Sequence, residues 1–350
     1  MTDSPLIRED VAGFLALVNS LPAPEALIPQ EQREGYLGLK AMTEADPRPL
    51  AVIKDLTCPG PAGDIPVRFY DVRESRDPSP VVLFFHGGGF VIGDLDTHNS
   101  LCTELSAELD LPVLAVHYRL APEHPFPAAP DDCEAAARWL AGSPAELGRT
   151  VTGLVTIGGS AGGNLATVTA RALCDKPAAA PMLLQVLLYP CTDESQDGSM
   201  NTFAEGHLLT KAVMEWFYSL YLPVSGDPRA FPLHASAKGM CPSIVVTAGL
   251  DPLQDQGLRI ADKLVEAGVD TLYLHIPGMT HDFSSTRKAL PSAAAATITS
   301  LAKYSSAAVS VISVPMAAAT YSMAKYTASA MGRPHLPRTT RRPRGPDRKS

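Results

Sequence analysis

Short apolar runs alternate with longer helix-forming stretches over most of this 350-residue chain, and this alternation restricts the fold more than any other feature. Runs such as Val81–Phe85 are continuously apolar, as is typical of strands buried on both faces of a sheet. Strands are expected at 67–70, 81–85, 113–118, 154–157, 183–188, 244–247 and 272–276. Helices are expected at about 97–110, 130–141, 161–175, 253–268 and 288–303. The pattern predicts an α/β fold with a mostly parallel central sheet flanked by helices.

Two segments interrupt this pattern and are expected to form a helical cap over a main domain at 51–305. Residues 1–50 have the spacing of two amphipathic helices. Residues 190–242 contain an aromatic-rich helix at about 208–222 and are too long for an ordinary connection. Residues 306–350 are rich in Ala and Ser and then basic, so we expect a disordered tail.

Composition excludes several functional classes. The formal net charge of −8 argues against a general nucleic-acid or acidic-membrane binder. The six cysteines are scattered, without the spacing of a zinc site, so neither a metal nor a disulfide framework is expected. Charged residues interrupt the N-terminal region where a secretory signal would be apolar, so we expect a cytoplasmic protein. Tyr304–Ala324 matches a membrane span in length but is only weakly apolar, so no membrane association is expected.

The strongest chemical signal is the sequence Gly-Gly-Ser-Ala-Gly at residues 158–162, which fits the pattern G-x-S-x-G. An expected strand enters the motif and an expected helix leaves it, as a nucleophile elbow requires. Small residues are needed there because the serine occupies a strained turn that bulky neighbours would obstruct. Ser160 is therefore the predicted nucleophile.

A second signal, His86 followed by three glycines, comes directly after the strand at 81–85. Consecutive glycines allow backbone N–H groups to turn toward the oxyanion of a tetrahedral intermediate. We expect the oxyanion donors to be Gly88, Gly89 and Ala161. His86 is expected to orient this loop.

Together with three further motifs, these residues resemble the hormone-sensitive-lipase-like esterases, also called bacterial family IV. The other motifs are residues 118–127 (Tyr-Arg-Leu-Ala-Pro-Glu-His-Pro-Phe-Pro), 251–253 (Asp-Pro-Leu) and 278–281 (Gly-Met-Thr-His). The resemblance spans about residues 50 to 305. It implies an α/β-hydrolase fold, serine carboxylesterase activity toward short acyl esters, no cofactor, and a cap. It also allows a homodimer.

In that fold the acid and the base follow the serine in the order Ser, acid, His, on loops after strands. Asp251 follows the strand at 244–247, and His281 follows the strand at 272–276. They are the predicted acid and base. Rival acids are Asp193, Glu194 and Asp255.

The sequence departs from the family pattern at two positions beside the triad. The residue before the serine is usually acidic in the family and is Gly159 here, and the residue after the base is usually Gly and is Asp282 here. If the Asp282 carboxylate approached the imidazole ring, activity would shift toward higher pH. A carboxylate that faces solvent is the alternative.

Aromatic residues are concentrated in the second cap segment. Phe203, Trp216 and Phe217 are candidates for lining the substrate pocket, although packing in the core would account for each of them singly. The predicted function is a serine carboxylesterase that hydrolyses short-chain acyl esters, with a small-molecule ester as its partner. Alternatives are a lactone or carbamate hydrolase with the same triad, or a non-catalytic small-molecule receptor on the same fold.

Overall fold

A single eight-stranded sheet organises the computed structural model, which describes residues 5–20 and 28–297. The strands are β1 (Val52–Gly60), β2 (Gly63–Asp71), β3 (Ser79–Phe85), β4 (Val113–Val116), β5 (Val151–Gly159), β6 (Met182–Leu188), β7 (Ser243–Leu250) and β8 (Thr271–Thr280). Their order is β1-β2-β4-β3-β5-β6-β7-β8. Only the pairs β1–β2 and β2–β4 are antiparallel, so the predicted mostly parallel sheet is confirmed.

The helices follow the predicted alternation. They are α1 (Glu9–Ser20), α2 (Pro29–Thr43), α3 (Asn99–Leu109), α4 (Ala128–Ala141), α5 (Ala161–Asp175), α6 (Ser199–Thr202), α7 (Lys211–Tyr221) and α8 (Gln254–Glu266). Short 3-10 helices lie at Ala145–Leu147, Pro232–His234 and Phe283–Ser285. Residues 291–297 are helical, and the rest of the helix predicted at 288–303 lies outside the described residues. So do the expected tail at 306–350 and the uncharged stretch at 304–324.

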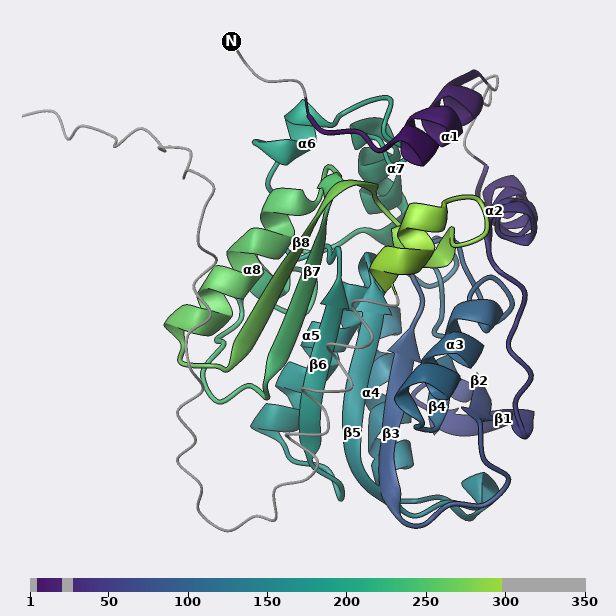
Figure 1. Ribbon diagram of the computed structural model, residues 1–350. Helices are drawn as coiled ribbons and strands as arrows, with labels where there is room; N and C mark the ends of the chain where they lie inside the picture. Colours follow the sequence, from purple (N-terminus) through teal and green to yellow (C-terminus); the bar gives the residue numbers. More distant parts are fainter. Residues whose placement is uncertain (1–4, 21–27, 298–350) are drawn as a thin grey trace, which may run out of the picture. The chain divides into compact units, whose positions relative to one another are not determined.

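Both faces of the sheet are buried, as the continuous apolar runs predict. In β3, Val81, Leu83 and Phe85 face a cluster that includes α4, α5 and α8, whereas Val82 and Phe84 face one that includes α3 and residues 291–297. Figure 1 shows α4 and α5 behind the sheet and α3 in front of it. Because each such side chain contributes about 1.5 to 3 kcal/mol when buried, the sheet is a stable base for the loops that follow its strands.

The edge strand β1 was not among the predicted strands. Alternate residues of β1 are exposed, and it contains Lys54, Asp55 and Pro59. It pairs along its whole length with β2. Its position at the edge explains why it lacks the continuous apolar run by which the inner strands were recognised.

Both proposed cap segments contact the loops that follow the parallel strands. From α2, the Arg33 guanidinium donates to the Val91 carbonyl (2.9 Å) and pairs with Glu123 (2.7 Å). From α7, the Tyr221 ring stacks on Phe90 at 3.9 Å between centroids. These contacts support the proposal that 1–50 and 190–242 form one cap. No helix in the described ranges is long and apolar enough to cross a membrane.

Candidate active site

Ser160 occupies the sharp turn between β5 and α5. Its backbone angles, φ 55° and ψ −120°, are strained for a residue with a side chain. Three backbone hydrogen bonds hold the turn: the Ser160 amide donates to Leu188 O (2.9 Å), and its carbonyl accepts from Asn164 N (3.1 Å) and Cys191 N (3.2 Å). The residue remains 9% exposed. The structure therefore has the strand, sharp turn and helix that a nucleophile elbow requires.

The glycines of the motif are required by close backbone contacts. A Cβ atom on Gly158 would lie 2.2 Å from the carbonyl oxygen of Gly162, and one on Gly162 would lie 2.0 Å from the carbonyl oxygen of Phe85. The second contact brings the first turn of α5 against the end of β3. The serine and the predicted oxyanion loop, which begins directly after β3, are thereby brought together.

The glycine loop has the conformation expected of an oxyanion loop. Gly88 and Gly89 have φ values of 113° and 59°, which favour glycine. The Gly88 carbonyl accepts hydrogen bonds from Val91 N (3.0 Å) and Ile92 N (2.9 Å), which fold the loop back on itself. Within the described residues, the amides of Gly88, Gly89 and Ala161 donate none of the hydrogen bonds found outside regular helices and strands. They are thus available to a ligand.

His86, at the start of this loop, is held by contacts with Gly87 and Tyr118. Its ring stacks on Tyr118 with centroids 4.2 Å apart, its Nδ1 lies 2.7 Å from the Gly87 carbonyl oxygen, and the Tyr118 hydroxyl donates to the His86 carbonyl (2.8 Å). Burial lowers the pKa of His86 to about 4, so the ring is neutral near pH 7. A neutral, fully packed ring fits the orienting role expected of it.

The predicted acid and base meet at the ends of β7 and β8. These strands pair through Leu250 and Thr280, so the residues that follow them, Asp251 and His281, leave the sheet side by side. His281 Nδ1 lies 2.8 Å from Asp251 Oδ2. The Asp251 side chain is completely buried, and its other oxygen accepts from the Leu253 amide (2.8 Å). With its proton on Nδ1, the imidazole presents an unprotonated Nε2, as a general base must.

Ser160 and His281 follow strands β5 and β8, whose carboxyl ends lie at the same edge of the sheet. In the part of the chain that the structure describes, no hydrogen bond joins the Ser160 hydroxyl to the imidazole. Such bonds are often long before a substrate binds. Tyr189, after β6, contacts both segments: its ring is 4.8 Å from the His281 ring, and a Cβ on Gly159 would meet its Cε2 at 2.9 Å.

The rival acids have other partners. Asp193 pairs with Arg259 (2.7 Å), and Glu194 lies 3.5 Å from His234. Asp255 accepts from the Ser199 amide (2.9 Å). Of the candidate acids, the structure brings Asp251 to His281.

The three candidate pocket residues lie in different environments. A Cβ on Gly89 would be 2.1 to 2.4 Å from ring atoms of Phe217, so this buried ring lies directly on the glycine loop. The Trp216 ring is half-buried and 5.1 Å from that of Phe217. Phe203 is instead buried in the cluster that contains Val11 and Phe14 of α1.

Sequence reasoning missed Tyr189 and Lys40. Tyr189 has a left-handed backbone (φ 36°) immediately after β6, where the sequence Tyr-Pro marks a turn but no function. Lys40 lies in a helix whose other charged residues are mostly exposed, yet its ammonium group binds Asp282 (2.5 Å), next to the predicted base. No local pattern could have revealed a contact between positions this far apart in the chain.

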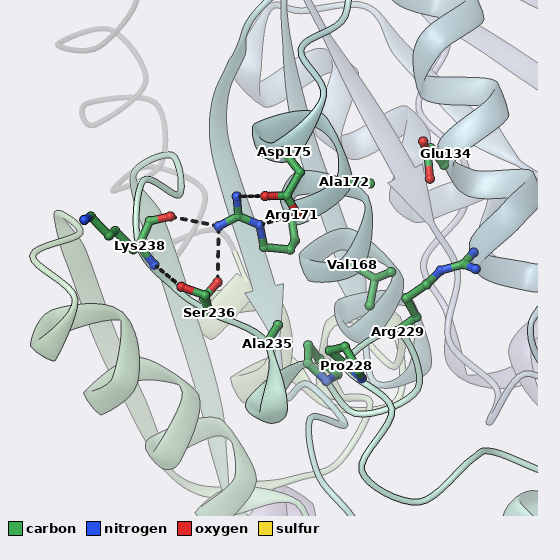
Figure 2. A pocket seen from close by; sticks show the side chains of 11 residues that line it. Glu134, Val168, Arg171, Ala172, Asp175, Pro228, Arg229, Ala235, Ser236 and Lys238 are labelled. Atoms are coloured by element: carbon green, nitrogen blue, oxygen red, sulfur yellow. Dashed lines mark hydrogen bonds and ion pairs between the residues drawn. The ribbon is translucent and has the colours of Figure 1, made fainter.

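A surface hollow of about 480 Å³ lies between α4, α5 and residues 228–238 (Figure 2). On its wall the Arg171 guanidinium binds Asp175 and the carbonyl oxygens of Ser236 and Lys238. None of its lining residues is a predicted catalytic, oxyanion or pocket residue. Among the described residues, no group of three or more His, Cys, Asp or Glu side chains is arranged to hold a metal ion.

The sequence of this chain matches a described protein family and curated relatives. Residues 82–285 match a sequence family described as having the alpha/beta hydrolase fold. The chain is 41% identical over 257 residues to the carboxylic ester hydrolase LipN of Mycobacterium tuberculosis, covering 70% of this chain and 68% of that protein. It is 37% identical over 292 residues to an ethyl acetate hydrolase of Pseudomonas putida, covering 79% and 92%.

Solved structures agree with these sequence matches. An ester hydrolase from the metagenome of Lake Arreo, bound to a bipyridine phosphonate derivative, superposes with a TM-score of 0.81 at 35% identity, over 86% of this chain and 99% of that one. A thermostable esterase from Pseudomonas putida superposes with a TM-score of 0.82 at 31% identity, over 90% and 100%. The sequence relatives and the solved structures therefore agree on the fold.

Proposed function

The chain belongs to the α/β-hydrolase family and is a carboxylic ester hydrolase, and we propose that Ser160, His281 and Asp251 carry out its reaction on short-chain acyl esters. The observation that supports this best is the bond between His281 and Asp251, at the sheet edge where the elbow presents Ser160. With the enzyme class known, the receptor alternative is set aside. Hydrolysis of a lactone or carbamate would use the same groups.

The first half of the proposed reaction forms an acyl-enzyme. Ser160 Oγ attacks the acyl carbon while its proton moves to His281 Nε2, and Asp251 stabilises the resulting imidazolium. The carbonyl oxygen becomes an oxyanion, to which Gly88, Gly89 and Ala161 donate backbone hydrogen bonds. A single such donor typically contributes about 2.7 to 4 kcal/mol of transition-state stabilisation. The imidazolium then protonates the leaving alkoxide, and the alcohol departs.

The second half releases the acid. A water molecule gives a proton to His281 Nε2 and attacks the acyl carbon, and the same amides stabilise the second oxyanion. When this intermediate collapses, the proton returns to Ser160 Oγ and the carboxylic acid leaves. No step requires a cofactor.

The preference for short chains is attributed to Phe217. Its ring packs against Gly89, whose amide is a proposed oxyanion donor, so it limits the space beside the acyl group. The stacking of Phe90 on Tyr221 and the bond from Phe126 N to Tyr221 O (2.9 Å) hold α7 in this position. A long acyl chain would have to displace the ring.

The proposed function is tested with p-nitrophenyl esters from acetate to palmitate. Wild type should hydrolyse acetate and butyrate best. Phe217→Ala should raise kcat/KM for octanoate relative to acetate by roughly tenfold, because pocket contacts of one or two methylenes are worth about that much. The control Met214→Ala removes a buried side chain one turn earlier in α7 and should leave the ratio unchanged. A wild-type preference for palmitate would contradict the short-chain assignment, and an unchanged ratio in Phe217→Ala would contradict the role of the ring.

A further inference from the structure

Asp282, the residue after the proposed base, has a left-handed backbone and an almost completely satisfied carboxylate. Its φ of 60° explains why the family usually has glycine here, since aspartate is among the few other residues that tolerate this region. Its Oδ2 accepts from Lys40 Nζ (2.5 Å) and the Tyr36 hydroxyl (3.1 Å), and its Oδ1 accepts from Ser285 Oγ (2.6 Å). None of its hydrogen bonds goes to His281.

Lys40 brings a buried positive charge to this site from the cap helix α2. Its side chain is 4% exposed, and its ammonium group also donates to Ser285 Oγ (2.5 Å) and to the Ser285 carbonyl (3.1 Å). The Tyr36 ring lies 4.9 Å from the ammonium. A buried ammonium is costly unless it is paired, and Asp282 provides the carboxylate.

The pair is connected to the imidazole in two ways. Asp282 follows His281 in the chain, so whatever fixes the Asp282 backbone also fixes the base. In addition, the Tyr189 hydroxyl donates to Asp282 Oδ1 (3.4 Å) and bonds to Ser284, while the Tyr189 and His281 rings pack in a T-shaped arrangement.

Near the proposed base, the positive charge of Lys40 therefore balances the negative charge of Asp282. Burial alone would raise the pKa of Asp282, but the Lys40 ammonium and the hydrogen bonds from Lys40 and Ser285 outweigh it and hold this pKa well below its usual value. Asp282 is thus an anion near neutral pH. His98 also faces this carboxylate, but burial, followed by the Lys40 charge, lowers the pKa of His98 far below its usual value and leaves it neutral. The groups that face the imidazole itself are Asp251 and Tyr189.

We propose that Lys40 is a positioning residue for the reaction: from the cap it fixes the loop that carries His281 and cancels the charge of Asp282 beside the imidazole. This inference rests on the proposed function, in which His281 is the base. Helix α2 then does more than cover the site, because its packing against the histidine loop keeps the base in place.

The test is the pH dependence of kcat/KM for p-nitrophenyl acetate. In Lys40→Met the Ser285 and Tyr36 hydroxyls still donate to the Asp282 carboxylate and keep it ionised. This unbalanced anion beside the imidazole favours the imidazolium, so the acid limb of the pH–rate profile should move to higher pH by about 0.5 to 1 unit. Loss of positioning should lower kcat more than it changes KM. Adding Asp282→Asn to Lys40→Met should move the limb back, because the unbalanced anion is removed. Lys40→Arg, which retains the charge, should keep the limb near its wild-type position.

Controls separate this effect from general loosening of the cap. Arg33→Met removes a second ion pair of α2, with Glu123, and should leave the acid limb unmoved. If Lys40→Met does not fold, Lys40→Gln keeps a hydrogen-bond donor without the charge and should give the same shift. The inference would be overturned if the folded Lys40→Met or Lys40→Gln variant had the wild-type pH profile, or if Arg33→Met moved the acid limb by the same amount. Ser160→Ala, measured in parallel, tests the proposed function itself: if it remained active, the assignment of the base would fail independently of Lys40.

Discussion

Replacing Ser160 with alanine is expected to lower kcat/KM for p-nitrophenyl acetate by roughly 10⁴- to 10⁶-fold, the range seen when a serine nucleophile is removed from such a site. Without Oγ no acyl-enzyme can form. The glycine amides would still polarise a bound ester, so a small residual rate above that in water should remain. The measurement is steady-state hydrolysis, together with the release of p-nitrophenol in the first turnover, which should disappear.

The matched control is Ser199→Ala. Ser199 is also buried, and its hydroxyl donates to the Pro252 carbonyl (2.8 Å) and accepts from the Asp255 amide (3.0 Å). Its loss should lower the thermal midpoint while hydrolysis stays within a few-fold of wild type. Substantial hydrolysis by purified Ser160→Ala would rule out the covalent mechanism.

Asp251→Asn is expected to lower kcat by about 10⁴-fold, with little change in KM. Asp251 is completely buried, and its carboxylate accepts a hydrogen bond from the Nδ1–H group of His281. An amide that turns its NH₂ group toward the ring would favour the tautomer with the proton on Nε2, which cannot accept the serine proton. The side chain keeps its shape, so the fold should be retained, as circular dichroism would check.

The comparison for this variant is Asp193→Asn, at the rival acid. Asp193 is also buried, but its carboxylate binds Arg259 and Ser195 rather than a histidine. Loss of this pair should lower stability and leave kcat within a few-fold of wild type. The opposite outcome, a large loss in Asp193→Asn and a small one in Asp251→Asn, would reassign the acid.

The fold could be predicted wherever burial leaves a local pattern. Strand β3 is buried on both faces, so Val81–Phe85 is apolar throughout and its strand was predicted from that run alone. Strand β1 was missed because it pairs on one side only and carries charged residues, Lys54 at a half-buried position and Asp55 at an exposed one. Its place in the sheet depends on its pairing with β2, and no local pattern in residues 52–60 reveals that pairing.

The candidate site was predictable for a similar reason. The elbow and the glycine loop are short segments whose conformation requires glycine, so Gly88, Gly89 and Gly162 indicate their geometry in the sequence. Lys40 has no such signal, because a lysine in an amphipathic helix usually faces solvent. The structure explains why residue 159 is glycine, because a side chain at this position would meet the Tyr189 ring.

The contact between Lys40 and Asp282 also has a consequence for biosynthesis. The two residues are 242 positions apart, so α2 leaves the ribosome long before its carboxylate partner exists. The proposed positioning of the base by α2 can therefore arise only after the chain has been synthesised through residue 282.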